Sequence, residues 1–151
     1  MESAQQAYDD QARLWNGPAG RAWVEAQAVL DQMFKPLEEL LVEEVRAGER
    51  VLDVGCGTGA TTLAVAQRTG TSGQAGGIDI SGPMLDAARN RAQREGLPAG
   101  FIQADAQSHA FAPASFDRIL SRLGVMFFAD PAQAFANLRR AAREGGGRGG
   151  G

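Results

Sequence analysis

The segment 51–59, with the sequence VLDVGCGTG, constrains the fold of this chain more than any other stretch. It joins an apolar run, which is typical of a buried strand, to three glycines at alternating positions, Gly55, Gly57 and Gly59. Residues 60–67 have small and apolar side chains and are predicted to form a helix. A strand, a glycine turn and a helix together form a nucleotide-binding element, because glycines let a ligand approach the backbone and the helix offers unpaired N–H groups.

Asp53 stands two residues before the first of these glycines and helps to decide which ligand such an element binds. Dinucleotide-binding folds space their glycines as G-x-G-x-x-G and keep the helix N-terminus free for a pyrophosphate. Here the spacing is G-x-G-x-G, and a carboxylate ahead of it would repel a pyrophosphate. The pattern therefore favours a ligand with an amino group or a positive centre. The plainer alternative is a glycine turn that binds no ligand.

The rest of the chain alternates between helical and strand patterns. Apolar spacing predicts N-terminal helices, separated by the turn signal Asn16-Gly17-Pro18 and with a kink or a new helix start at Pro36. Because strands then alternate with helices, we predict an α/β fold with a parallel sheet covered on both faces. The predicted strands are 51–54, 75–80, 100–104 and 116–121, and helices are expected after each of the first two and from Pro131 onward.

The length of 151 residues predicts a single domain. We expect this domain to span 1–144, with an N-terminal helical cap at 1–48 and an α/β core at 49–144. A glycine-rich tail follows at 145–151.

Acidic side chains are predicted at the carboxyl ends of three successive strands, which is where open α/β sheets bind their ligands. Asp79 ends the second strand, where a carboxylate can accept both hydroxyls of a ribose, although it can equally cap the helix that begins near Ser81. Asp105 follows the third strand, where it can accept a hydrogen bond from an exocyclic amine. The fourth strand ends at Ser121 and Arg122.

Four of these segments resemble motifs of the class I S-adenosylmethionine-dependent methyltransferases. LDVGCGTG resembles the first motif of the family, and GIDIS at 77–81 resembles its ribose-binding motif. PML at 83–85 is similar to the segment that packs on the adenine, and ADA at 104–106 to the motif that binds the adenine amine. The similarity runs from about residue 8 to about residue 143. It implies a Rossmann-like doubly wound sheet, S-adenosylmethionine as cofactor, and methyl transfer to a small-molecule acceptor.

The resemblance also implies a set of cofactor-binding residues, and alternatives remain for several of them. Cys56 is better interpreted as a small side chain that fills space in the turn, and Met84 is as readily a core residue. Arg122 could face an anionic substrate or pair with an acid. No catalytic residue is assigned, because the methyl group carries its own leaving group, and no metal is expected. The implied cofactor set is Asp53, Gly55, Cys56, Gly57, Thr58, Gly59, Asp79, Ile80, Met84, Asp105, Ala106 and Arg122.

Composition excludes several other function classes. The net charge is −3, with acids and bases interspersed, which gives no electrostatic case for nucleic acid or an anionic membrane. No apolar run approaches the ~20 residues of a membrane span, and the polar N-terminus is not a secretory signal. Because Cys56 is the single cysteine, no internal disulfide can form. We therefore expect a cytoplasmic protein.

Departures from the family pattern limit what the resemblance implies. Its base-methylating branch carries an Asp/Asn-Pro-Pro-aromatic box after the fourth strand; this chain reads SRLGVMFF there, which argues against nucleic-acid bases as acceptors. The family sheet has seven strands in the order 3-2-1-4-5-7-6, whereas four are predicted here, because the glycines of 145–151 are not expected to form a buried strand. We therefore expect an exposed edge on the fourth strand, and a homodimer or larger assembly through that edge or through the last helix. The alternative function is a cofactor-binding half-domain that acts by self-association without turnover.

The tryptophans of the N-terminal segment and the single histidine each have two interpretations. Trp15 and Trp23 flank an aromatic-rich segment that, in similar methyltransferases, covers the cofactor; they could equally anchor helices to the sheet. His109 is the only histidine, and a solvated loop position is favoured over proton transfer.

Overall fold

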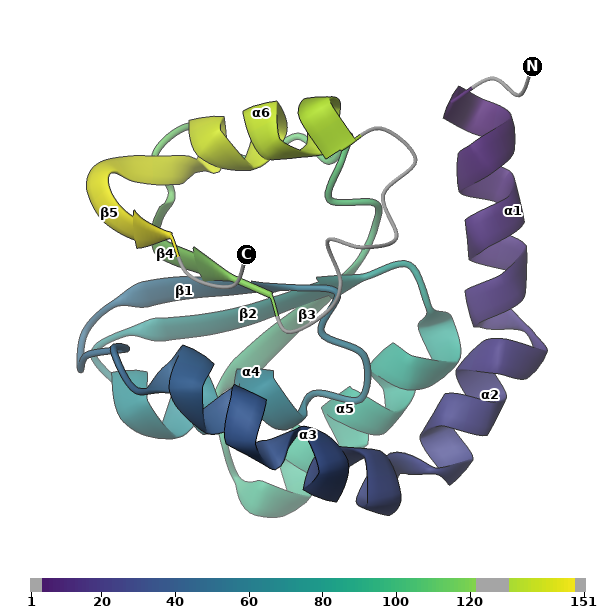
Figure 1. The fold of residues 1–151 in the computed structure, drawn as a ribbon. Helices are drawn as coiled ribbons and strands as arrows, with labels where there is room; N and C mark the ends of the chain where they lie inside the picture. Colours follow the sequence, from purple (N-terminus) through teal and green to yellow (C-terminus); the bar gives the residue numbers. More distant parts are fainter. Residues whose placement is uncertain (1–3, 122–130, 149–151) are drawn as a thin grey trace.

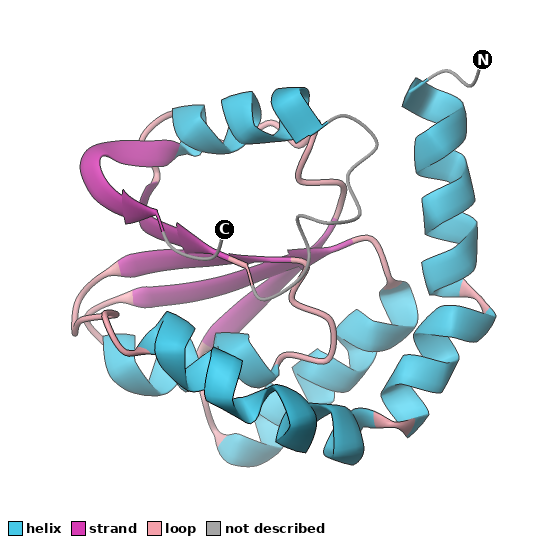
Figure 2. Ribbon diagram, in the orientation of Figure 1, coloured by secondary structure: helices cyan, strands magenta, loops and turns pink. Residues whose placement is uncertain are grey.

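The computed structural model of the chain describes residues 4–121 and 131–148, which form an α/β fold (Figure 1). Figure 2 shows how helices and strands alternate along it. The helices are α1 (Ala4–Asn16), α2 (Pro18–Glu25), α3 (Gln27–Val42), α4 (Ala60–Thr69), α5 (Gly82–Glu95) and α6 (Pro131–Ala141). The strands are β1 (Arg50–Val54), β2 (Gln74–Asp79), β3 (Ala99–Gln103), β4 (Phe116–Leu120) and β5 (Ala142–Arg148).

The strands form one parallel sheet in the order β3-β2-β1-β4-β5. This confirms the predicted Rossmann-like arrangement, in which the first strand is central and the chain winds outward in both directions. Val54 lies opposite Ile78, and Asp79 opposite Gln103, so β1, β2 and β3 end at the same edge. The loops after these strands are therefore neighbours.

Alternating side chains of the sheet build a hydrophobic core on each face, as the strand period of two requires. Leu52 and Ile119 point to one face, where they join Leu138 of α6. Val51 and Leu120 point to the other, where they join Val65 of α4. Figure 1 shows α6 on one side of the sheet and α4 and α5 on the other. The prediction of a parallel sheet covered on both faces is confirmed.

The N-terminal helices lie beside the core, and their breaks differ in part from the prediction. Gly17 separates α1 from α2, as the turn signal predicted, and α1 and α2 lie near the start of α5 (Figure 1). A new helix does not start at Pro36, because α3 continues through it. Phe34 and Leu37, on either side of the proline, are half-buried. This packing offsets the backbone hydrogen bond that proline cannot donate.

The expected exposed edge on the fourth strand is wrong, because β5 pairs in parallel with β4. Phe116 lies opposite Ala142 and Ile119 opposite Arg148, with a register shift between Phe116 and Arg118. The ladder needs backbone groups alone, so a glycine-rich strand is weak but able to pair. Helix α6 supplies the crossover that a parallel connection requires. The sheet edge on this side is therefore β5, which extends into the predicted tail.

None of the helices in the described ranges is long and apolar enough to cross a membrane.

Candidate cofactor-binding site

The glycine turn after β1 is held against the end of β2. The N–H groups of Gly55 and Cys56 both donate to the carbonyl oxygen of Ile78, at 2.8 and 3.2 Å. Gly55, Gly57 and Gly59 have φ angles of 70, 54 and 91°, in the left-handed region that side chains disfavour. The alternating glycines are therefore needed to form this turn, and Gly59 leads directly into α4.

Asp53, the acid ahead of the turn, is buried inside the site. Its side chain is 2% exposed, and the hydroxyl of Thr62 donates to its Oδ2 at 2.7 Å. Thr62 comes from α4, so this bond fixes the carboxylate between strand and helix. The sequence analysis did not single out Thr62, although two threonines in the first turn of an apolar helix were a usable signal. Thr58, also predicted, is buried in the turn.

Cys56 fills space between the turn and the sheet, which agrees with the favoured interpretation. A Cβ atom on Gly77 of β2 would lie 2.7 Å from the Cys56 sulfur and 3.0 Å from a ring carbon of Phe101. The missing side chain of Gly77 is thus what admits the cysteine. Burial, followed by the charges of Asp53 and Asp79, raises the pKa of the Cys56 thiol well above its usual range. The thiol is therefore protonated and not a nucleophile.

Asp79 joins the two loops of the site. Its Oδ2 accepts from the N–H of Gly57 at 2.9 Å, and its Oδ1 accepts from the N–H of Ser81 at 2.9 Å. Ser81, in turn, caps α5 by accepting from the N–H of Met84. Burial raises the pKa of the Asp79 carboxyl, and the backbone hydrogen bonds oppose that rise. Asp79 therefore bonds both the loop after β2, at Ser81, and the glycine turn after β1, at Gly57.

The two larger apolar residues of the predicted set, Met84 and Ile80, differ in burial. Met84 is buried, and its methyl group lies 2.8 Å from where a Cβ on Gly57 would stand, so it packs directly on the glycine turn. Ile80 is half-buried in the loop after β2.

The loop after β3 is fixed by α6. Asp105 accepts a hydrogen bond from the N–H of Gln107 through Oδ1, at 2.9 Å, while the side chain of Ala106 lies in the core. Asn137 of α6 donates to the carbonyl oxygens of Ala106 and His109, each at 2.8 Å. His109 is half-buried and stacks edge-to-face with Phe111. The loop that carries Asp105 is therefore held by a hydrogen bond of its own and by Asn137 of α6.

At the end of β4, the hydroxyl of Ser121 donates to the carbonyl oxygen of Val54 at 2.8 Å. Arg122, the remaining predicted residue, lies outside the described residues.

The arrangement brings three acids to neighbouring strand ends: Asp53 at the end of β1, Asp79 at the end of β2 and Asp105 after β3. Such an edge suits a cationic ligand with ribose hydroxyls and an amine. Within the described residues, no group of three or more His, Cys, Asp or Glu side chains is placed to hold a metal ion.

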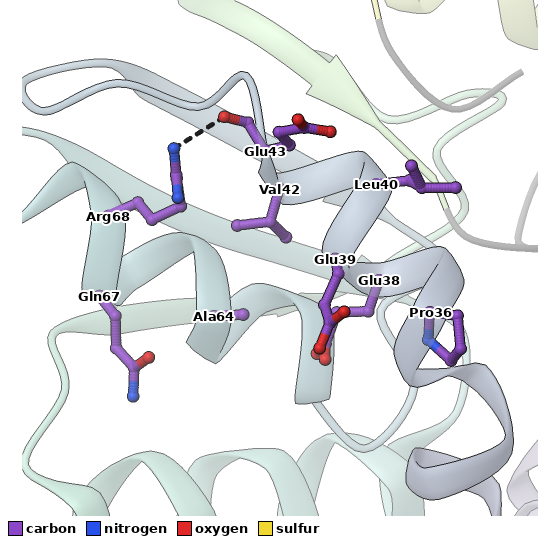
Figure 3. A pocket seen from close by; sticks show the side chains of 9 residues that line it. All are labelled: Pro36, Glu38, Glu39, Leu40, Val42, Glu43, Ala64, Gln67 and Arg68. Atoms are coloured by element: carbon purple, nitrogen blue, oxygen red, sulfur yellow. Dashed lines mark hydrogen bonds between the residues drawn. The ribbon is translucent and has the colours of Figure 1, made fainter.

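A separate cavity of about 720 Å³ lies between α3 and α4 (Figure 3). Arg68 lines it and donates to the carbonyl oxygen of Glu43 at 2.7 Å. Its lining includes no residue of the glycine turn, so it is distinct from the candidate site. The lining residues are Pro36, Glu38, Glu39, Leu40, Val42, Glu43, Ala64, Gln67 and Arg68.

Comparison with known proteins identifies the family of this chain. Residues 51–146 match a family profile described as a methyltransferase domain. Over 118 residues the chain is 36% identical to the aklanonic acid methyltransferase DauC of a Streptomyces species, covering 76% of this chain and 54% of DauC. It is 34% identical over 118 residues to the nocamycin O-methyltransferase of Saccharothrix syringae, covering 76% of this chain and 42% of that protein. The chain thus spans about half the length of these curated relatives.

Among solved structures, the crystal structure of the cyclase SpnF superimposes with a TM-score of 0.66 at 29% identity, covering 72% of this chain and 40% of SpnF. The glycine turn, the strand order and the match to residues 51–146 agree. This chain belongs to the methyltransferase domain family and has the Rossmann-like fold of class I S-adenosylmethionine-dependent methyltransferases.

Proposed function

We propose that this chain binds S-adenosylmethionine at the carboxyl edge of β1, β2 and β3 and supports methyl transfer to a small-molecule acceptor. The observation that carries the proposal is the position of Asp79, whose carboxylate bonds Gly57 of one loop and Ser81 of the next. The acid predicted to accept the ribose hydroxyls is thereby held beside the glycine turn, which in this proposal receives the methionine part of the cofactor.

The residues present fit such a cofactor. A carboxylate has about four lone-pair sites, so the two N–H bonds to Asp79 leave capacity for ribose hydroxyls. The turn at Gly57 presents backbone instead of side chains, and Met84 supplies a buried apolar surface against it. Asp53 and Asp105 add negative charge for a sulfonium with an amino group. In this proposal, Asp105 accepts the adenine amine.

Bound S-adenosylmethionine would supply an activated methyl group whose leaving group is already attached. The protein then has to bind and orient the cofactor and exclude water, and the described part of the site supplies acids and backbone groups for this task. The thiol of Cys56 is no nucleophile for this chemistry, because its raised pKa keeps it protonated.

For the acceptor we propose a small organic molecule. The names of the two curated relatives specify aklanonic acid and nocamycin, and the second names an O-methyltransferase. Because this chain spans about half of each relative, the acceptor and the turnover of the whole protein are part of the proposal.

A second candidate function is cofactor binding without methyl transfer. The similarity to SpnF, which is described as a cyclase, favours this second candidate, because proteins of one fold can have different functions. Self-association would then be the activity that remains, and β5 is the sheet edge through which a homodimer could form. Light scattering at micromolar concentration tests this part: a dimer supports it, and a monomer contradicts it.

The proposed transfer is tested with methyl-labelled S-adenosylmethionine and a panel of small phenols, carboxylates and amines. Label in a panel product, lost in Asp79→Ala, supports methyl transfer. Cofactor binding without labelled product supports the second candidate and excludes the first for these acceptors. Label in a nucleic acid offered in parallel would contradict the small-molecule assignment.

A further inference from the structure

The joint between α1 and α2 lies directly against the loop that follows β2. The N–H of Gly82 donates to Oδ1 of Asn16 at 2.7 Å, and Nδ2 of Asn16 donates to the carbonyl oxygen of Ile80 at 2.9 Å. One side-chain amide therefore bonds the residues on both sides of Ser81. The side-chain amide of Gln103, at the end of β3, also donates to Oδ1 of Asn16, at 3.2 Å.

Ser81 itself is fixed by the same joint. Its hydroxyl donates to the carbonyl oxygen of Trp15 at 2.5 Å, and the residue is fully buried. Gly20 of α2 completes the contact, because a Cβ there would lie 1.8 Å from the Trp15 oxygen and 2.8 Å from the Ser81 hydroxyl. The joint and the loop are thus in contact without room for a further side-chain atom.

One backbone group, the N–H of Ser81, connects the contact between Asn16 and this loop to the candidate site. The N–H of Ser81 donates to Oδ1 of Asp79 at 2.9 Å. The same peptide group carries the Ile80 carbonyl that Asn16 bonds, and the next peptide group carries the Gly82 N–H that donates to Asn16. The direction of that N–H therefore depends on Asn16. Without it, the Ile80–Ser81 peptide group loses the bond from the Asn16 amide at its carbonyl, and one of the two bonds that orient Asp79 weakens.

We propose that Asn16 is a positioning residue for the cofactor site: it holds the loop 80–82 so that Asp79 keeps the orientation needed to accept the ribose. The inference rests on the proposed function, in which Asp79 binds the cofactor. It also explains the residue type, since the position needs one acceptor for Gly82 and one donor for Ile80, and an asparagine amide supplies both. Aspartate keeps the acceptor but loses the donor, and alanine loses both.

The test measures binding of S-adenosylhomocysteine by calorimetry to the full chain and its variants. We expect Asn16→Ala to weaken affinity about tenfold, as expected when an oriented hydrogen bond to a charged group is lost. Asn16→Asp should weaken it as well, because it removes the donor to the Ile80 carbonyl. The matched control is Asp31→Asn, which removes a 2.7 Å ion pair with Arg91 between α3 and α5. It loosens the same N-terminal layer away from the loop and should leave affinity unchanged.

A double-mutant cycle separates positioning from a general loss of structure. If Asn16 acts through Asp79, Asn16→Ala should have little further effect on affinity in an Asp79→Ala background. Amide hydrogen exchange gives a second measurement that does not need the ligand: the Ser81 N–H should lose protection in Asn16→Asp and keep it in Asp31→Asn.

Three outcomes would overturn the inference: wild-type affinity in Asn16→Ala, an equal loss in both backgrounds, or unchanged protection of Ser81. They are distinct from failure of the proposed function, in which the wild-type chain itself does not bind S-adenosylhomocysteine. That result would contradict both the proposed function and the role of Asn16.

Discussion

The contact between Cys56 and Gly77 makes the sharpest prediction about what places the glycine turn. Gly77→Ala puts a Cβ at 2.7 Å from the Cys56 sulfur, 2.8 Å from its Cβ and 3.0 Å from a Phe101 ring carbon. Real Cβ contacts are not this short, so the turn, the ring or the strand must move. The Cys56 Cβ is attached to a turn that bonds Ile78, and it cannot rotate away.

The expected cost is at the upper end of overpacking, about 3 kcal/mol. For a chain of this size that lowers the melting temperature by about 6–12 °C. Because the turn is displaced as well, affinity for S-adenosylhomocysteine should fall in the same variant. Cys56→Gly removes both close atoms and should recover part of the loss, so the two changes should couple by about 1 kcal/mol or more.

The assay is thermal and urea unfolding followed by circular dichroism, with Gly76→Ala as the matched control. A Cβ on Gly76 meets nothing closer than 3.9 Å, so this neighbouring substitution should be neutral or stabilise by up to about 1 kcal/mol. If Gly77→Ala unfolds at the same temperature as Gly76→Ala, the turn is not held by this contact and the reasoning is wrong.

Three further predictions concern Asp79, Thr62 and Cys56. Asp79→Ala should weaken S-adenosylhomocysteine binding by about 2–3 kcal/mol in calorimetry. Because burial raises the Asp79 pKa, the contribution of Asp79 to stability is full below the unfolded-state pKa of about 3.9 and falls as pH rises through the raised value. If the differences in binding and in stability between the wild type and Asp79→Ala do not change with pH, this prediction is wrong. Thr62→Val removes the hydroxyl that bonds Asp53 and should cost about 1–3 kcal/mol in urea unfolding, whereas an unchanged midpoint would show that the bond is not needed. Cys56 should react with a thiol reagent only after urea unfolding, and fast labelling of the native chain would contradict its buried, protonated state.

The first four strands could be predicted from the sequence because their patterns are local, and their order followed from the family resemblance. The glycine turn, the cap at Ser81 and the alternating apolar strands each specify a local geometry, and parallel connections leave few ways to assemble them. The predicted acids accordingly lie at neighbouring strand ends. The fifth strand was missed because its glycines carry no side-chain signal, and only backbone pairing with β4 forms it.

The long-range contacts of the site could not be predicted from the sequence. Asn16 is 66 residues from Gly82, and Asn137 is 31 from Ala106, so no periodicity relates them. Gly77 begins the GIDIS segment and follows a second glycine, but neither pattern indicates that it contacts Cys56. Which of the two faces Cys56 depends on register, and register is set by the assembled sheet. These residues support the loops without having a recognisable motif of their own.

The central claim is that three strand-end acids and a glycine turn form a site for S-adenosylmethionine and not for a dinucleotide. Calorimetric titration of the purified chain with S-adenosylhomocysteine and with NAD⁺ tests it most directly. We predict saturable binding of S-adenosylhomocysteine, abolished or strongly weakened in Asp79→Ala, and no heat of binding with NAD⁺. Binding of NAD⁺ alone, or of neither ligand at millimolar concentration, would contradict the claim.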